Sequence, residues 1–109
     1  MMPISQELLR VYETGDTIVV GFGEGDVPEY LDIAQMRDEI IELLQLHQAS
    51  AIAFDLTGVM HVPSVMLGLL ASLKKSGYPV HLYNPCRNVR SVLGVTGLDR
   101  LFHLHDLVA

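Results

Sequence analysis

The chain has 109 residues, with 7 Lys+Arg against 13 Asp+Glu, a formal net charge of -6 and one Cys. This length predicts one domain, spanning residues 1–109. A hydrophobic content of 50% supports a packed core, and one Cys excludes an internal disulfide framework and a cysteine-based zinc site. No apolar run reaches the ~20 residues of a membrane span, and the N-terminus lacks the features of a signal peptide. We therefore expect a cytoplasmic protein, and its acidity argues against nucleic acid as a partner.

The first third of the chain predicts a hairpin followed by a loop and a helix. Residues 8–12 and 17–22 are short apolar runs around a Glu-Thr-Gly-Asp turn, which is typical of a β-hairpin. Residues 23–30 contain two Gly, one Pro and three acidic residues, and this composition predicts a loop. Asp32 favours the start of a helix, with Gln35 three residues later as in a capping box. Apolar residues at helical spacing continue this helix until about residue 47.

The remainder predicts strands that alternate with helices. Residues 51–56 and 79–83 are short apolar runs, which are typical of strands in a parallel sheet. Between them, Ser64 is a suitable cap for a second helix over residues 65–76. Asn84, followed by proline, similarly predicts the cap of a third helix.

These elements define the fold class and the position of the binding edge. A last edge strand or a short helix is expected over residues 101–104, so the order is β-β-α-β-α-β-α-β. This order predicts an α/β domain with a mixed, mostly parallel sheet and right-handed crossover helices. The carboxyl ends of parallel strands share one edge, where open α/β sheets bind their ligands. The acidic loop, Ser64 and the start of the third helix should therefore be neighbours.

Residues 55–70, DLTGVMHVPSVMLGLL, resemble a motif of the STAS domain family, the anti-sigma factor antagonists and their relatives. The matches at the strand end are Asp55, Leu56, Thr57 and Val59, and those at the end of the motif are Leu67 and Gly68. Ser64 falls on the serine that is phosphorylated in the family. Residues 81–102, HLYNPCRNVRSVLGVTGLDRLF, are similar to the family's later strand, Asn-Pro turn and helix. The resemblance implies a STAS-like fold for essentially the whole chain.

The resemblance also implies a function by protein–protein recognition, without enzymatic activity, cofactor or metal. In the family, the unmodified domain binds an anti-sigma factor or related serine kinase and frees a sigma factor, and phosphorylation reverses this. A phosphate on Ser64 would add about -1.5 to -2 charges at a helix N-terminus, next to acidic side chains. The residues expected to contact the partner surround this serine: Glu24, Asp26, Glu29, Met60, His61, Pro63, Ser64, Val65, Met66 and Leu67.

Departures from the family motif support an alternative function. Pro63 stands in place of the family's Asp, Val65 in place of its second Ser, Met66 in place of its Gly, and His61 in place of its aromatic residue. A STAS domain without the phosphorylation switch could serve as an adaptor or as an assembly subunit of a stress-signalling or transport complex. A homo-oligomer is compatible with either function.

The acidic loop, GFGEGDVPEY, has two interpretations. Its glycine spacing does not fit a nucleotide-binding fingerprint, and its three acids would repel phosphates. It is either a flexible acidic segment that faces a basic partner or a solvated turn. Residues 1–54 contain ten acidic and two basic side chains, whereas residues 55–109 contain three and five. This asymmetry can orient a charged partner.

Other candidate chemistries are weaker. Asp55 ends a central strand as in a response-regulator receiver, but the acidic pair that such a fold needs after its first strand is missing. Cys86, expected in the first turn of the third helix, suggests packing more than a nucleophile, and an enzyme remains a third hypothesis. His103 and His105 share a face if they lie on a strand, but a third metal ligand is not evident. His61 and His81 are isolated in the sequence.

Overall fold

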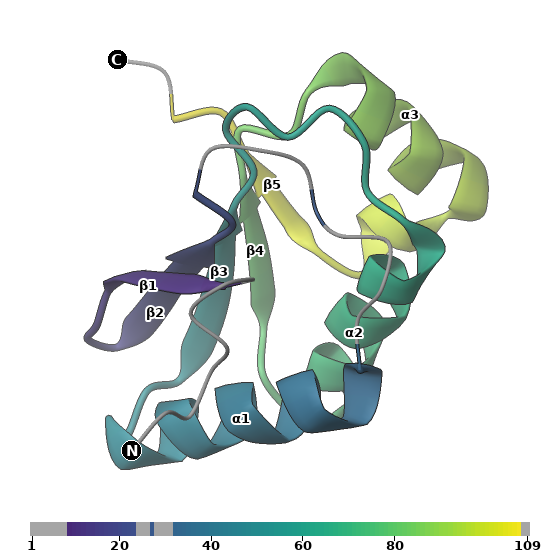
Figure 1. Ribbon diagram of the computed structural model, residues 1–109. Helices are drawn as coiled ribbons and strands as arrows, with labels where there is room; N and C mark the ends of the chain where they lie inside the picture. Colours follow the sequence, from purple (N-terminus) through teal and green to yellow (C-terminus); the bar gives the residue numbers. More distant parts are fainter. Residues whose placement is uncertain (1–8, 24–26, 28–31, 108–109) are drawn as a thin grey trace.

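The computed structural model describes residues 9–23, 27 and 32–107, which form a five-stranded sheet with helices packed against it (Figure 1). The strands are β1 (Arg10–Glu13), β2 (Thr17–Gly21), β3 (Ala51–Asp55), β4 (Val80–Tyr83) and β5 (His103–His105). The helices are α1 (Ile33–Leu46), α2 (Ser64–Lys75) and α3 (Arg87–Thr96), followed by a 3-10 turn, η1 (Leu98–Arg100). The predicted order of strands and helices is confirmed, and the last element is the edge strand.

The sheet has the order β1-β2-β3-β4-β5. The first pair is antiparallel and the other three pairs are parallel. From β2 to β5, each new parallel strand lies next to the preceding one and always in the same direction across the sheet. Because the crossovers are right-handed, all three helices then lie on the same face of the sheet. At the carboxyl ends, Gly21, Asp55, Tyr83 and His105 pair in one row across four strands. The expected common edge is therefore present, and we call it the carboxyl edge.

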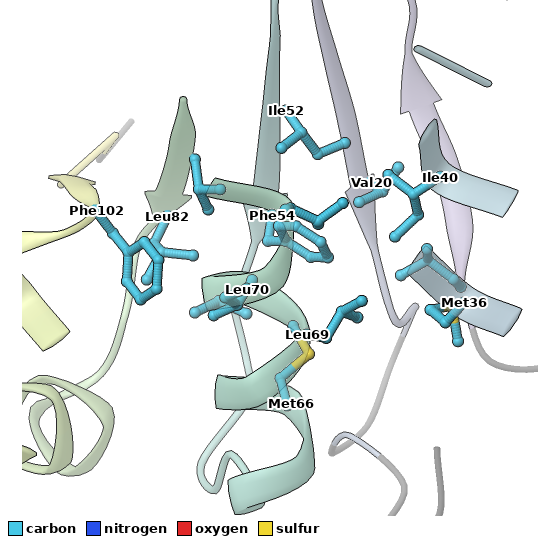
Figure 2. Packing of buried hydrophobic residues seen from close by; sticks show 14 of the residues in the cluster. Val20, Met36, Ile40, Ile52, Phe54, Met66, Leu69, Leu70, Leu82 and Phe102 are labelled. Carbon is cyan, nitrogen blue, oxygen red and sulfur yellow. The ribbon is translucent and has the colours of Figure 1, made fainter. Parts of the chain in front are cut away.

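The core lies between this sheet and the three helices (Figure 2). Alternate strand residues, such as Ile52 and Phe54 of β3, point toward the helices because side chains on a strand alternate between its faces. Helix α2 buries a stripe at helical spacing: Met66, Leu69, Leu70 and Leu73. The other set of strand residues faces away from the helices, and among them His81 and Tyr83 are half-buried.

Helix α1 begins at the predicted cap. The Asp32 carboxylate accepts a hydrogen bond from the Gln35 backbone N–H at 3.0 Å. The Gln35 side chain turns toward Glu39 at 3.5 Å, so the capping box is only half formed. We predict that Asp32→Ala lowers the free energy of unfolding by about 1 kcal/mol, measured by urea denaturation. Asp38→Ala, at an exposed position within α1, should change it by less than about 0.5 kcal/mol, and equal losses would contradict the cap assignment.

The other two helices begin differently from the prediction. Pro63 occupies the N-cap position of α2 and forms no side-chain cap bond, so Ser64 is the first helical residue rather than the cap. The N-cap of α3 is Cys86, and Asn84 lies before the helix with a φ of 57°, in the left-handed region. The Asn-Pro pair thus forms the turn that leaves β4, and the Asn84 side chain serves another role.

No helix among the described residues is both long enough and apolar enough to cross a membrane.

Candidate functional site

The loop between β3 and α2, residues 56–63, brings the predicted site residues to the surface. Its start is anchored by the buried side chains of Leu56 and Val59. The Leu56 backbone N–H donates to the Tyr83 carbonyl at 2.9 Å, which ties the loop to β4. Gly58, with a φ of 82°, makes a turn that favours glycine. Beyond these anchors the chain leaves the carboxyl edge and reaches the start of α2 (Figure 1).

A set of hydrogen bonds, which we call the carboxyl-edge network, fixes this loop to the neighbouring strands. The Asp55 carboxylate accepts bonds from the Thr57 hydroxyl at 2.6 Å and from the Thr57 N–H at 3.0 Å. The Asn84 amide donates to the Thr57 hydroxyl at 2.9 Å, and its carbonyl oxygen accepts from the Leu107 N–H at 2.6 Å. The network therefore joins the segments that follow β3, β4 and β5. Asp55 is thus a hydrogen-bond acceptor within its own loop.

Ser64 is exposed at the first position of α2. The N–H groups of Met66 and Leu67 bond to the Pro63 carbonyl at 2.9 and 3.4 Å, and the first turn contains no acidic residue. The first backbone N–H groups of a helix lack intrahelical partners and favour a negative charge. Since Ser64 is not the cap, a modification of its hydroxyl would not remove a helix-capping bond.

Apolar and aromatic groups surround this serine. Met60 is 51% exposed, His61 is exposed, and Pro63, Val65 and Leu67 are half-buried. A pocket separates this loop from α3, and its lining residues are Met60, His61, Val62, Leu67, Asn88, Val89 and Val92. The loop before Ser64 and the start of the third helix are therefore neighbours, as expected, whereas most of the acidic loop that was expected beside them lies outside the described residues.

Met66 does not belong to this surface. Its side chain is fully buried and packs in the core beneath α2 (Figure 2). The reason is its helical spacing with Leu69, Leu70 and Leu73, a signal that was already present in the sequence. Its assignment to the partner-contacting residues is therefore corrected: Met66 is a core residue, and its bulk does not cover Ser64.

The acidic side chains Glu24, Asp26 and Glu29 lie outside the described residues. Between them, Val27 is 5% exposed and belongs to the same hydrophobic cluster as the helices and the sheet. At the start of this segment, the Gly23 N–H donates to the Tyr12 hydroxyl at 2.9 Å. The segment thus begins at the carboxyl end of β2 and is anchored in the core at Val27.

The thiol of Cys86 has a structural contact. It is half-buried and lies 3.7 Å from the Met60 carbonyl, to which it can donate a weak hydrogen bond. This contact holds the loop against the start of α3, in keeping with the packing role favoured for Cys86.

The structure reveals a group of histidines that the sequence did not indicate. His81 of β4 pairs with His103 of β5, and its ring also contacts His105. The alternation of His103 and His105 predicted their shared face, but the strand register that brings His81 between them is not visible in the sequence. Among the described residues, no three His, Cys, Asp or Glu side chains are placed to hold a metal ion.

Solved structures with a similar fold include anti-sigma factor antagonists. The anti-sigma factor antagonist SpoIIAA in its unphosphorylated form matches with a TM-score of 0.69 and 19% identity, over 88% of this chain and 86% of that chain. The phosphorylated form of SpoIIAA, a Bacillus cell fate determinant, matches with a TM-score of 0.57 and 20% identity, over 88% and 89%. The crystal structure of TM1081 from Thermotoga maritima, described as a candidate anti-sigma factor antagonist, gives 0.66 and 21%, over 92% and 87%.

No protein-family model matches the sequence, and a search of the curated proteins gives no match. The structural likeness, at about a fifth sequence identity, establishes that the chain has the STAS fold of these proteins.

Proposed function

We propose that this protein is a binding module of the anti-sigma-factor-antagonist type, with an anti-sigma factor or related serine kinase as its partner. The observation that carries the proposal is the exposure of Ser64 at the N-terminus of a 12-residue helix on a scaffold with the STAS fold. The proposed contact surface comprises the exposed or half-buried members of the predicted set: Met60, His61, Pro63, Ser64, Val65 and Leu67. The acidic residues Glu24, Asp26 and Glu29 complete it in the proposal.

The composition of this surface supports recognition of a protein. Met60 is 51% exposed, and a flexible methionine side chain adapts its shape to a partner. Contiguous exposed apolar groups rimmed by polar groups are typical of interaction sites. Ser64 lies within this patch, so a phosphate there would place about -1.5 to -2 charges in the middle of the contact. Binding would then require the partner to remove water from that charge, which costs free energy. Phosphorylation would therefore release the partner.

The switch predicts a specific result for Ser64→Asp. We expect it to weaken binding to the cognate anti-sigma factor kinase at least about tenfold, measured by titration calorimetry with serine kinases from the same genome. The same variant should raise the free energy of unfolding by about 0.3–1 kcal/mol, because a carboxylate in the first turn of α2 interacts favourably with the helix dipole. Weakened binding in a more stable protein would exclude unfolding as the cause.

Two controls accompany this variant. Ser64→Ala removes the hydroxyl without adding charge and should bind as tightly as the wild type. Ser76→Asp adds the same charge at the opposite end of α2, where Ser76 is exposed, and should leave binding unchanged. Unchanged affinity of Ser64→Asp would reject the switch.

The adaptor alternative is distinguished by direct phosphorylation. Incubation with the partner kinase and Mg-ATP, followed by mass spectrometry, should show one added phosphate in the wild type and none in Ser64→Ala. Pro63, which replaces the family's carboxylate before the serine, is the feature that favours the alternative. Tight binding without phosphate transfer would identify a constitutive adaptor.

A further inference from the structure

Three imidazole rings gather on the sheet face that the helices leave uncovered. His81 of β4 lies opposite His103 of β5, and His105 follows on the same face two residues later. The ring centroids of His81 and His103 are 4.7 Å apart, with an interplanar angle of 24°. We call His81, His103 and His105 the histidine cluster.

His81 and His105 are joined by a hydrogen bond between their rings. His81 Nδ1 and His105 Nε2 are 2.9 Å apart, while the ring centroids are 5.1 Å apart with an interplanar angle of 27°. The ring centroids are much farther apart than the two nitrogens, so the nitrogens lie between the centroids. The two rings therefore meet edge to edge, with a small angle between their planes. Such a contact is an N–H···N bond, so one nitrogen carries the proton and the other offers a lone pair.

This bond depends on the number of protons in the pair. With both rings neutral, or with one extra proton, one nitrogen remains an acceptor and the bond persists. When both rings are charged, two N–H groups face each other and the charges repel. Burial, and then the charges of His103 and His105, lower the pKa of His81. The contacts that lower the pKa of His81 therefore also oppose the state in which both rings are charged.

Few other charges among the described residues can offset this repulsion. From β3, Ala53 lies opposite His81, and the carboxylate of Asp55 is directed to Thr57. From β4, the Tyr83 ring forms a T-shaped contact with the His105 ring at a centroid distance of 5.5 Å. After β5, Asp106 is paired with Arg90 at 2.6 Å. From β2, Val19 and Gly21 contribute no charge to this face.

The position of the bond determines what its loss would change. Strand β5 has three residues and lies at the edge of the described sheet, next to β4. The Asn84 N–H donates to the His105 carbonyl at 2.7 Å, so the backbone attachment of β5 lies beside the ring contact. We infer that the histidine cluster is a proton-responsive device, which holds the carboxyl end of β5 on β4 when it is neutral or singly protonated and releases it when His81 and His105 are both charged.

Hydrogen exchange of the folded wild-type protein, followed by NMR, tests this inference. Between pH 7.5 and 5.5, and after correction for the intrinsic rate, protection of the Asn84 amide should fall about two- to tenfold, the effect of losing one ordinary hydrogen bond. The Leu56 amide, which bonds to the Tyr83 carbonyl between β3 and β4, is the internal reference and should not change. Equal behaviour of both amides would overturn the inference.

Variants and ring titrations give independent readouts. His105→Gln should make Asn84 protection insensitive to pH, whereas His47→Gln, at an exposed position after α1, should behave as the wild type. In the wild type, the ring signals of His81 should titrate below the ordinary range of a histidine, because burial and the neighbouring rings lower the pKa of His81. Titration of His81 within the ordinary range would contradict the device even if the variants failed to fold.

The same cluster contributes to the pH dependence of stability with a defined sign. Because the pKa of His81 is lowered in the folded chain, the unfolded chain binds this proton first as the pH falls below 6.5. The contribution of His81 to stability is therefore complete above that pH, and it decreases as the pH falls toward the lowered pKa of His81 in the folded chain. The urea midpoint should decrease less on acidification in His81→Gln than in the wild type, and an unchanged dependence would oppose the inference.

Discussion

Replacing Phe54 with alanine is expected to lower the free energy of unfolding by about 3–5 kcal/mol, the largest effect of any single change considered for this protein. Phe54 is fully buried near the middle of the sheet, in the cluster that joins β3 to the helices (Figure 2). Removal of its ring loses the free energy gained when this apolar surface leaves water. It also leaves a cavity that a close-packed core fills only in part.

The magnitude is decisive for a chain of this size. Natural domains are stable by about 5–15 kcal/mol, so a loss of 3–5 kcal/mol removes a large share of the total. Urea denaturation followed by circular dichroism would measure it. Leu46→Ala is the matched surface control, because Leu46 ends α1 with 63% of its surface exposed, and it should change stability by less than about 0.5 kcal/mol. Similar losses in the two variants would mean that Phe54 is not the centre of the core.

The fold was largely predictable because its signals are local and repeated. The apolar runs of the strands and the helical spacing of residues such as Met36, Ile40 and Leu44 each specify one element and its buried face. Alternation of strands and helices then leaves few topologies, and a parallel sheet places the strand ends at one edge. The convergence of the loop before Ser64 with the start of α3 follows from that topology.

The parts that sequence did not reveal depend on contacts between distant residues. Asn84 precedes a proline, a local pattern typical of a helix start, yet its partners are Thr57 and Leu107 on other segments. His81 looked isolated because its neighbours are fixed by the register of β4 against β5. The N-cap of α2 is Pro63 instead of the predicted Ser64, a shift of one position. Helix boundaries commonly differ by one or two residues between assignments.

The second large effect concerns Asn84, whose contribution has a conformational part and a hydrogen-bonding part. Its backbone φ of 57° lies in the left-handed region, which costs a residue with a Cβ other than asparagine or aspartate about 1–2 kcal/mol. Its side chain donates to Thr57 and accepts from the Leu107 N–H, and each such bond contributes about 1 kcal/mol. Asn84→Ala loses both parts, so we expect a decrease in the free energy of unfolding of about 3 kcal/mol.

Asn84→Gly separates the two parts, because glycine adopts the left-handed conformation without strain but has no side chain to bond. We expect it to lose about 2 kcal/mol, less than the alanine variant, while Asn88→Ala on exposed α3 surface stays within about 0.5 kcal/mol of the wild type. In both Asn84 variants the Thr57 hydroxyl loses the same donor, so the loop that leads to Ser64 should become more mobile in each. Equal stability of the glycine variant and the wild type would show that the carboxyl-edge network does not hold that loop. The placement of Ser64 would then rest on the loop's other attachments, which include the buried anchors Leu56 and Val59 and the contact between Cys86 and Met60.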